Sequence, residues 1–178
     1  GAQRVRHYSL GAAARLGLDP ETRRRIRRIA EYHSLLFLPL PDALWGTMER
    51  ETNTDSLIQT DASLALKLMS LIPDLSDCLS ALEVLTQDMR HDAINHSDAA
   101  ENLPIESQIV AVARAFDELT SRHPFQPAAS YSEAIQELRN LSTPFYSKRV
   151  IDALAAFLAE DAPRPKETQA PHTTGGQS

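Results

Sequence analysis

The chain has 178 residues, 42% of them hydrophobic and 24% charged, with a formal net charge of −6. That is enough for one domain with a buried core. The lone Cys78 excludes an internal disulfide, fits a reducing cytoplasm and, without a basic neighbour, is expected to be an inert packed thiol. No apolar stretch approaches the roughly 20 residues that cross a bilayer, and no signal peptide precedes the first predicted helix. We therefore expect a cytoplasmic domain that does not enter a membrane.

Positive charge is concentrated at the beginning of the chain. The first 28 residues carry eight arginines against Asp19 and Glu21, which leaves ten basic and 22 acidic side chains for the remainder. The run RRRIRR could indicate a nucleic-acid contact. On a helix, however, its arginines share a solvated face while Ile26 and Ile29 face inward, and the acidic remainder would repel phosphate. We expect no nucleic-acid binding.

Helix signals follow one another along the chain, whereas β-branched runs are scarce. Gly17 ends the first predicted helix, and Asp19 and Pro20 supply an N-cap and a first-turn proline for the second. Pro73 ends the third. The predicted helices span residues 5–17, 19–36, 55–72, 75–89, 104–122, 132–141 and 146–159. The expected fold class is all-α, a bundle of about seven helices.

Two polar stretches lie outside these helices. Residues 90–102, RHDAINHSDAAEN, are a predicted loop. From Ala162 the sequence lacks apolar content, so we expect a flexible tail. The predicted organisation is one domain over residues 1–161 and a C-terminal tail over residues 162–178.

The helix predicted over residues 104–122 is apolar nearly all round. One stripe on it is formed by Ile105, Ile109, Val112, Phe116 and Leu119. We expect this helix to be the central and most buried element. Arg114 interrupts the apolar run, and a guanidinium at that position needs a partner or a route to water.

Several stretches resemble HD-GYP domains, the bacterial phosphodiesterases that hydrolyse cyclic di-GMP. They include YSLGAAARLGL, the helix end YHS, PDAL, SEAIQELRN and VIDAL. LPIESQIVAVARAFDELTSRHPF is the stretch most similar to that family, and it makes the resemblance specific at residues 103–125. The resemblance extends to about Glu160 and implies an HD-domain-like helical bundle.

The resemblance also implies where the family's functional residues should lie, and this chain departs from them. The position of the HDxGK motif reads HSLLF: His33 is kept, Ser34 stands for a metal-binding aspartate, and Phe37 stands for the catalytic lysine. Arg114 stands for a second metal-binding aspartate. His123 replaces the arginine of the family's RPY segment, which looks like a phosphate binder.

The second family motif, HHExxDGxGYP, would fall on LTQDMRHDAIN. There Leu85 and Thr86 occupy the places of paired histidines, and residues 93–95 replace Gly-Tyr-Pro. This chemistry uses bridged metal ions that polarise the phosphoryl oxygens and activate a water, and each ion takes roughly four donors. We therefore expect no metal, no cofactor and no catalytic residue, and hence no enzyme.

Two readings of Arg114 remain open. Its guanidinium could occupy the emptied metal pocket, near His33 and an acceptor group, or it could snorkel to the surface along its aliphatic stem. Asp117 lies in the retained FDELTS segment and is expected to serve packing and hydrogen bonding. A general-base role for Asp117 is the alternative, although no companion residue is evident.

A literal His-Asp dipeptide occurs at His91 and Asp92, followed by His96. Such a pair is a weak signal by itself, and it falls in the predicted polar loop rather than on a helix. An adventitious metal site is the functional reading of this stretch.

Three hypotheses for function follow. The first is a catalytically inactive regulatory or protein-interaction domain of a bacterial signalling protein, for which the resemblance implies a diguanylate cyclase (GGDEF) domain or a second copy as partner. The second is an atypical metal-dependent phosphohydrolase that combines His33 with His91, Asp92 and His96. The third is a non-hydrolysing cyclic di-GMP receptor, whose base-stacking and phosphate-binding groups are mostly absent. The lost ligands in a retained fold favour the first.

Overall fold

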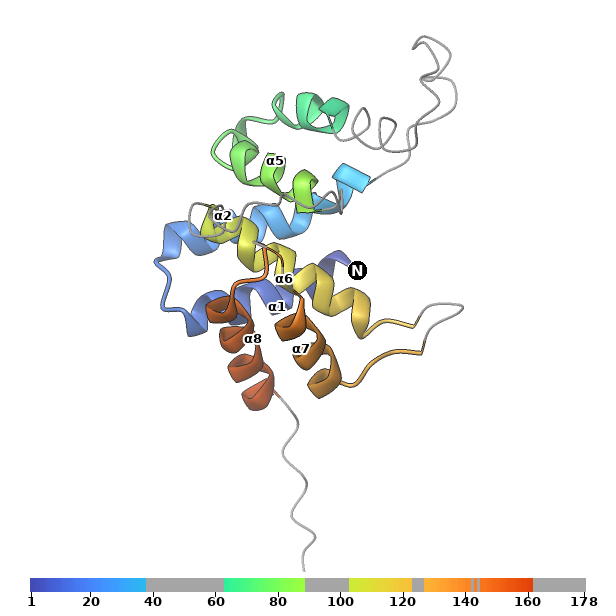
Figure 1. Ribbon diagram of the computed structural model, residues 1–178. Helices are drawn as coiled ribbons and strands as arrows, with labels where there is room; N and C mark the ends of the chain where they lie inside the picture. Colours follow the sequence, from blue (N-terminus) through green and yellow to red (C-terminus); the bar gives the residue numbers. More distant parts are fainter. Residues whose placement is uncertain (38–62, 89–102, 123–126, 142, 144, 162–178) are drawn as a thin grey trace, which may run out of the picture.

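The computed structural model describes residues 1–37, 63–88, 103–122, 127–141, 143 and 145–161. Its α-helices with described bounds are α1 (Ala2–Arg15), α2 (Pro20–Tyr32), α5 (Leu79–Asp88), α6 (Ile105–Leu119), α7 (Tyr131–Asn140) and α8 (Lys148–Asp161). Two 3-10 helices, η1 (His33–Phe37) and η2 (Pro73–Leu75), join them, and residues 63–69 are also helical. Within these ranges no strand occurs. The predicted all-α helical bundle is confirmed (Figure 1).

The turn between α1 and α2 is formed as its sequence predicts. Gly17 lies just beyond the end of α1 and has a positive φ of 66°. A residue with a side chain adopts this backbone conformation only with strain. Asp19 caps α2, because its Oδ1 accepts a hydrogen bond of 2.9 Å from the backbone N–H of Thr22. Pro20 occupies the first turn of α2.

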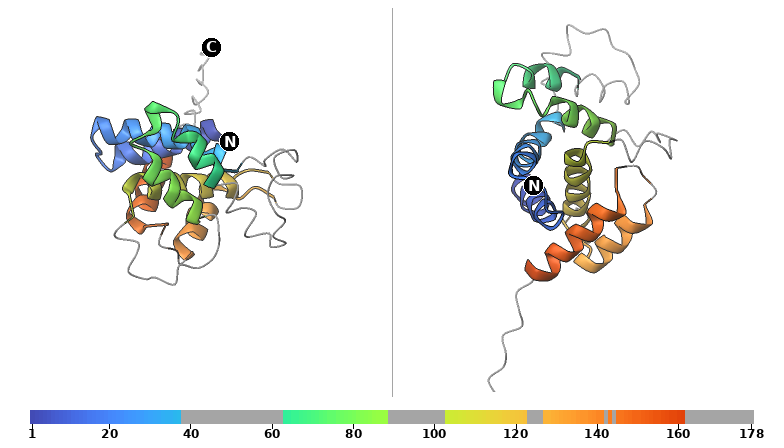
Figure 2. Two further views of the ribbon diagram at one scale, coloured as in Figure 1. Left: turned by 90° about the horizontal axis from the view of Figure 1, so that it is seen from above. Right: turned by 90° about the vertical axis from the view of Figure 1, so that its left-hand side faces the viewer.

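Helix α6 lies at the centre of the bundle. It contacts α1, α2, α5, α7 and α8. In the right-hand view of Figure 2, α1 and α2 (blue) lie beside α6 (olive), α5 (green) lies above it, and α7 and α8 (orange) lie below. Val112 and Phe116 are 1% and 0% exposed. The prediction of a central, buried helix in this region is confirmed.

Helices α7 and α8 complete the bundle. α7 begins with a capping box, in which the side chain of Ser130 accepts from the backbone N–H of Glu133 and the Glu133 carboxylate accepts from the backbone N–H of Ser130. α8 packs closely on α1, where the ring of Phe157 covers Gly11 and occupies the space of a Cβ at that position. A side chain at position 11 would therefore push these two helices apart.

Some predicted helix limits are corrected by the structure. The second helix ends at Tyr32 and tightens into η1, as helix ends often do. The fourth begins at Leu79 rather than residue 75, because Pro73 opens the short helix η2 instead. In the third predicted helix Leu64, Leu68 and Leu71 recur near helical spacing, yet Leu68 is 56% exposed and the neighbouring Met69 is buried.

Other predictions concern residues outside the described ranges. These are the loop over residues 90–102, the first part of the helix predicted over residues 55–72, and the tail over residues 162–178. Among the described residues, no helix has both the length and the apolar character that crossing a bilayer requires.

Candidate functional site

The candidate site centres on His33, the first residue of η1, which is 5% exposed. Its Nδ1 lies 2.7 Å from the carbonyl oxygen of Ala30, which can only accept, so Nδ1 carries a proton. Burial lowers the pKa of His33 below its ordinary value of 6.5. The charge of Arg114 and the amino terminus lower this pKa further, whereas the Ala30 hydrogen bond and Asp117 act in the opposite direction. His33 is therefore a neutral imidazole in the folded protein near neutral pH.

Arg114 projects from α6 at the edge of this site. Its side chain is 22% exposed, and Nη1 lies 3.8 Å from Oε2 of Glu118, one helical turn further on. Glu118 itself is 65% exposed, so this ion pair is screened by water and contributes little stability. The side chain of Arg114 is thus partly exposed, and its charge acts to lower the pKa of His33.

Asp117, the third member of the site, is 8% exposed and lies on α6 one turn beyond Ala113. Its Oδ1 is 2.8 Å from Nε of Arg4, and its Oδ2 is 2.7 Å from the backbone nitrogen of Gly1. Oδ1 has no well-aligned hydrogen bond within the described part of the chain. A buried carboxylate therefore pairs with a cation of α1, and its charge acts to raise the pKa of His33.

The remaining predicted positions lie at different places. Ser34 follows His33 in η1 and is half-buried. Phe37 ends η1. Leu85 and Thr86 are buried on α5, which contacts both α6 and η1. The positions of His123, His91, Asp92 and His96 are outside the described residues.

The described donors do not fit a metal cluster. No group of three or more His, Cys, Asp or Glu side chains that could hold a metal ion occurs within the described ranges. His33 and Asp117 are the acceptors present, and the fixed charge of Arg114 opposes a cation near His33. We therefore derive no chemical step through a metal ion from these residues.

Cys78 plays no part in the site. It is fully buried, and burial followed by the charge of Asp77 raises its pKa to about 12. The predicted inert, packed thiol is confirmed. We expect iodoacetamide at pH 8 to label the folded protein far more slowly than the protein in urea, as measured by mass spectrometry. Equal labelling rates in both conditions would contradict the buried placement.

Arg4 is the functional residue that the sequence reasoning missed. It donates to Thr120 Oγ1 at 2.8 Å in addition to its ion pair with Asp117, so it ties the first helix to the end of α6. Asp117 and Thr120 follow Arg4 by 113 and 116 positions in the chain, so no local spacing indicates that they are its partners. The only sequence signal was an arginine one helical turn before the buried Tyr8.

Comparison with known proteins defines the class to which this fold and site belong. The family model for the HD domain matches residues 1–150, so the chain belongs to the HD domain family. The resemblance to HD-GYP domains is thereby confirmed at the level of this superfamily.

Two curated relatives are similar over much of the chain. The cyclic di-GMP phosphodiesterase response regulator RpfG of Xanthomonas campestris pv. campestris is 27% identical over 155 residues, which cover 85% of this chain and 41% of the relative. The cyclic di-GMP phosphodiesterase of Thermotoga maritima is 32% identical over 104 residues, 56% of this chain and 28% of the relative. The chain thus spans less than half the length of either relative. No solved structure matches.

These matches correct one sequence-based prediction. We predicted that the chain is not an enzyme, because the expected metal ligands are replaced. The HD domain is a phosphohydrolase family, and both relatives are named phosphodiesterases, so that prediction is wrong. The prediction rested on replaced residues at a few aligned positions, whereas the family model matches residues 1–150 as a whole.

Proposed function

We propose that the chain is a phosphohydrolase domain of a bacterial signalling protein and acts on cyclic di-GMP through an atypical site. The similarity to a named cyclic di-GMP phosphodiesterase over 85% of the chain carries this proposal. The family membership over residues 1–150 supports the reaction class. The choice of cyclic di-GMP as substrate is part of the proposal, because the chain covers only 41% and 28% of the two relatives.

Within the described residues, the site offers groups with distinct roles in such a reaction. His33 is a buried, neutral imidazole and can accept a proton. Arg114 supplies a fixed positive charge beside it, which suits an anionic phosphoryl group. Asp117, paired with Arg4, is a buried carboxylate whose effect on the pKa of His33 is opposite to that of Arg114. In this proposal the sequence-based candidates His91, Asp92 and His96 supply the further donors that a metal-dependent reaction needs.

The test is hydrolysis of cyclic di-GMP by the purified chain, followed by anion-exchange chromatography. We expect turnover in Mn²⁺ or Fe²⁺ that EDTA abolishes, and a loss of at least about 100-fold in rate for His33→Ala, because a general base contributes on that scale. Arg149→Ala, an exposed position on α8, is the matched control and should keep the wild-type rate. An absence of turnover above the rate without protein, in protein loaded with either metal, would contradict the proposal.

We also infer a regulatory role through contact with another protein, either a GGDEF domain or a second copy of this chain. Leu71 is 76% exposed and Tyr131 is 51% exposed, so large apolar side chains are available on the surface of the described part. Size-exclusion chromatography with light scattering, of the chain alone and mixed with a GGDEF domain, tests this role. A monomer at every concentration that also fails to co-elute would contradict it.

A further inference from the structure

The arginine-rich helix α2 divides its cations between internal partners and an open surface. Three of its five arginines have acidic partners in the fold: Arg24, Arg25 and Arg28 pair with Glu21, Glu106 and Asp77. The Arg25 pair is the best formed, with an Nε–Oε1 distance of 2.9 Å and both side chains half-buried or better. The charges of these three arginines are therefore compensated within the fold itself.

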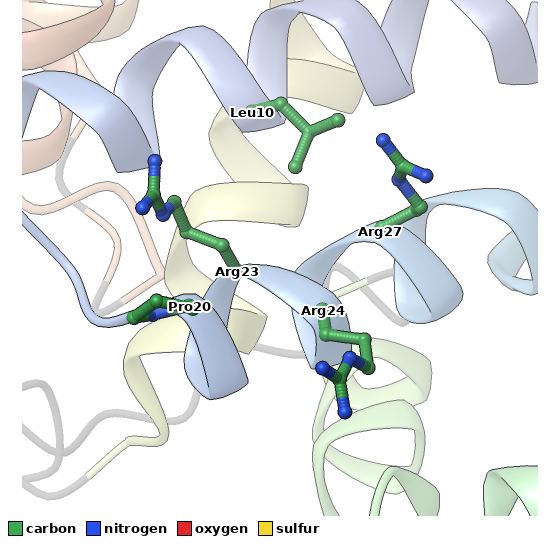
Figure 3. Close-up of a pocket in the computed structure, with 5 residues that line it drawn as sticks. All are labelled: Leu10, Pro20, Arg23, Arg24 and Arg27. Atoms are coloured by element: carbon green, nitrogen blue, oxygen red, sulfur yellow. The ribbon is translucent and has the colours of Figure 1, made fainter.

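Arg23 and Arg27 differ from them. Both are exposed, and neither guanidinium forms a hydrogen bond or ion pair with any described residue. They line an open hollow of about 390 Å³ together with Leu10, Pro20 and Arg24, which is paired with Glu21. Figure 3 shows that their guanidinium groups reach toward α1 on either side of Leu10, whereas the side chain of Arg24 points to the opposite side of α2.

A second hollow continues the first. It has a volume of about 520 Å³, shares Leu10 and Arg27 with the first, and extends past Gly11 to the ring of Phe157 on α8. Its other charged or titratable residues are already engaged, since Arg6 pairs with Glu31 and His7 pairs with Asp161, and Gln3 is a neutral polar residue. The two hollows together form one groove along α1 and α2, which we call the α1–α2 groove, with Arg23 and Arg27 as its uncompensated cations.

The shape and charge of this groove favour one kind of ligand. Both hollows are wide open, whereas a small-molecule site buries most of its ligand. A nucleic acid would bring a long run of phosphates against a chain with 22 acidic side chains beyond residue 28, whereas a helix can bring only the two carboxylates that the two arginines neutralise. Arg23 and Arg27 are four residues apart, which places their Cβ atoms about 6 Å apart on one face of the helix. Two carboxylates four residues apart on another helix have the same spacing.

We propose that the α1–α2 groove binds an acidic amphipathic helix of a partner protein. Two carboxylates, one turn apart, would pair with Arg23 and Arg27, and an apolar side chain on the same face would pack on Leu10. This inference deepens the regulatory role proposed above and rests on it. It assigns that role to the cationic groove, on the face formed by the first two helices.

The test uses a fluorescently labelled, alanine-based helical peptide of about 16 residues. The probe carries two glutamates four residues apart with a leucine on the same face, and its control has glutamine in place of both glutamates. Fluorescence anisotropy should show saturable binding of the glutamate peptide and weaker binding of the glutamine peptide. Arg27→Glu should weaken binding by about tenfold, because attraction becomes like-charge repulsion.

Arg149→Glu is the matched control, because it makes the same charge change at an exposed helical position, on α8, that lines neither hollow. It should change the affinity by less than about twofold, and circular dichroism should show both variants folded. Equal losses for the two variants, no saturable binding, or displacement by inorganic pyrophosphate beyond that of sodium chloride at equal ionic strength would each overturn the proposal. Since the assay does not use cyclic di-GMP, its failure is distinguishable from a failure of hydrolysis.

Discussion

Phe116→Ala is expected to lower the free energy of unfolding by about 3–5 kcal/mol. The side chain is 0% exposed and lies near the C-terminal end of α6. Its ring meets Tyr8 edge-on at a centroid distance of 5.0 Å and Tyr131 at 5.2 Å, so it joins α1, α6 and α7. The hydroxyl groups of these two tyrosines lie 3.3 Å apart, which restricts how far the rings can move to fill the space left by the phenyl group.

Urea unfolding followed by circular dichroism measures this loss. Leu68→Ala serves as the control, because Leu68 is 56% exposed and its truncation should change stability by no more than about 0.5 kcal/mol. A loss below about 1 kcal/mol for Phe116→Ala would show that this residue is not the packing centre of the bundle.

The course of α6 could be read from the sequence because its signal is local and repeated. Apolar residues at helical spacing from Ile109 to Phe116 fix which face is buried, and both of these side chains are fully buried. Local chemistry also fixed the turn at Gly17 and Asp19. Such features depend on neighbours within a few residues, so one sequence suffices to recognise them.

The exposed leucines show where local periodicity stops being informative. Leu68 and Leu71 continue a row of helical spacing, yet Met69 is the residue that reaches the core and helix 63–69 ends there. Helical spacing states which residues share a face, but the packing partner decides which face is buried. That partner is chosen by contacts between distant parts of the chain.

The candidate site was predictable only in part for the same reason. His33, Arg114 and Asp117 were singled out from the sequence, and the structure brings them close enough for both charges to act on the imidazole. The pairing of Asp117 with Arg4 and the division of the α2 arginines into paired and unpaired cations were not predicted. Ion pairs of this kind follow from the arrangement of helices, and spacing along the chain does not encode them.

The titration of His33 should respond in opposite directions to its two charged neighbours. Arg114 lowers the pKa of His33 and Asp117 raises it, although burial remains the largest cause of the lowered value. Arg114→Gln should therefore raise the pKa of His33, but not to its ordinary value of 6.5, and Asp117→Asn should lower it further. Each of these two changes on one helix removes a single charge of opposite sign, so the two variants provide controls for each other.

The measurement is a two-dimensional NMR titration of the imidazole in EDTA-treated protein, combined with urea unfolding at several pH values. The folded protein keeps His33 neutral, whereas the unfolded chain takes up a proton near pH 6.5, so stability falls as the pH drops below about 6.5 and levels off below the folded-state pKa. Arg114→Gln should make this loss smaller, because it narrows the gap between the two pKa values. Shifts of the same sign in both variants, or a titration of His33 at its ordinary value in the wild-type protein, would show that these three residues do not form one electrostatic unit.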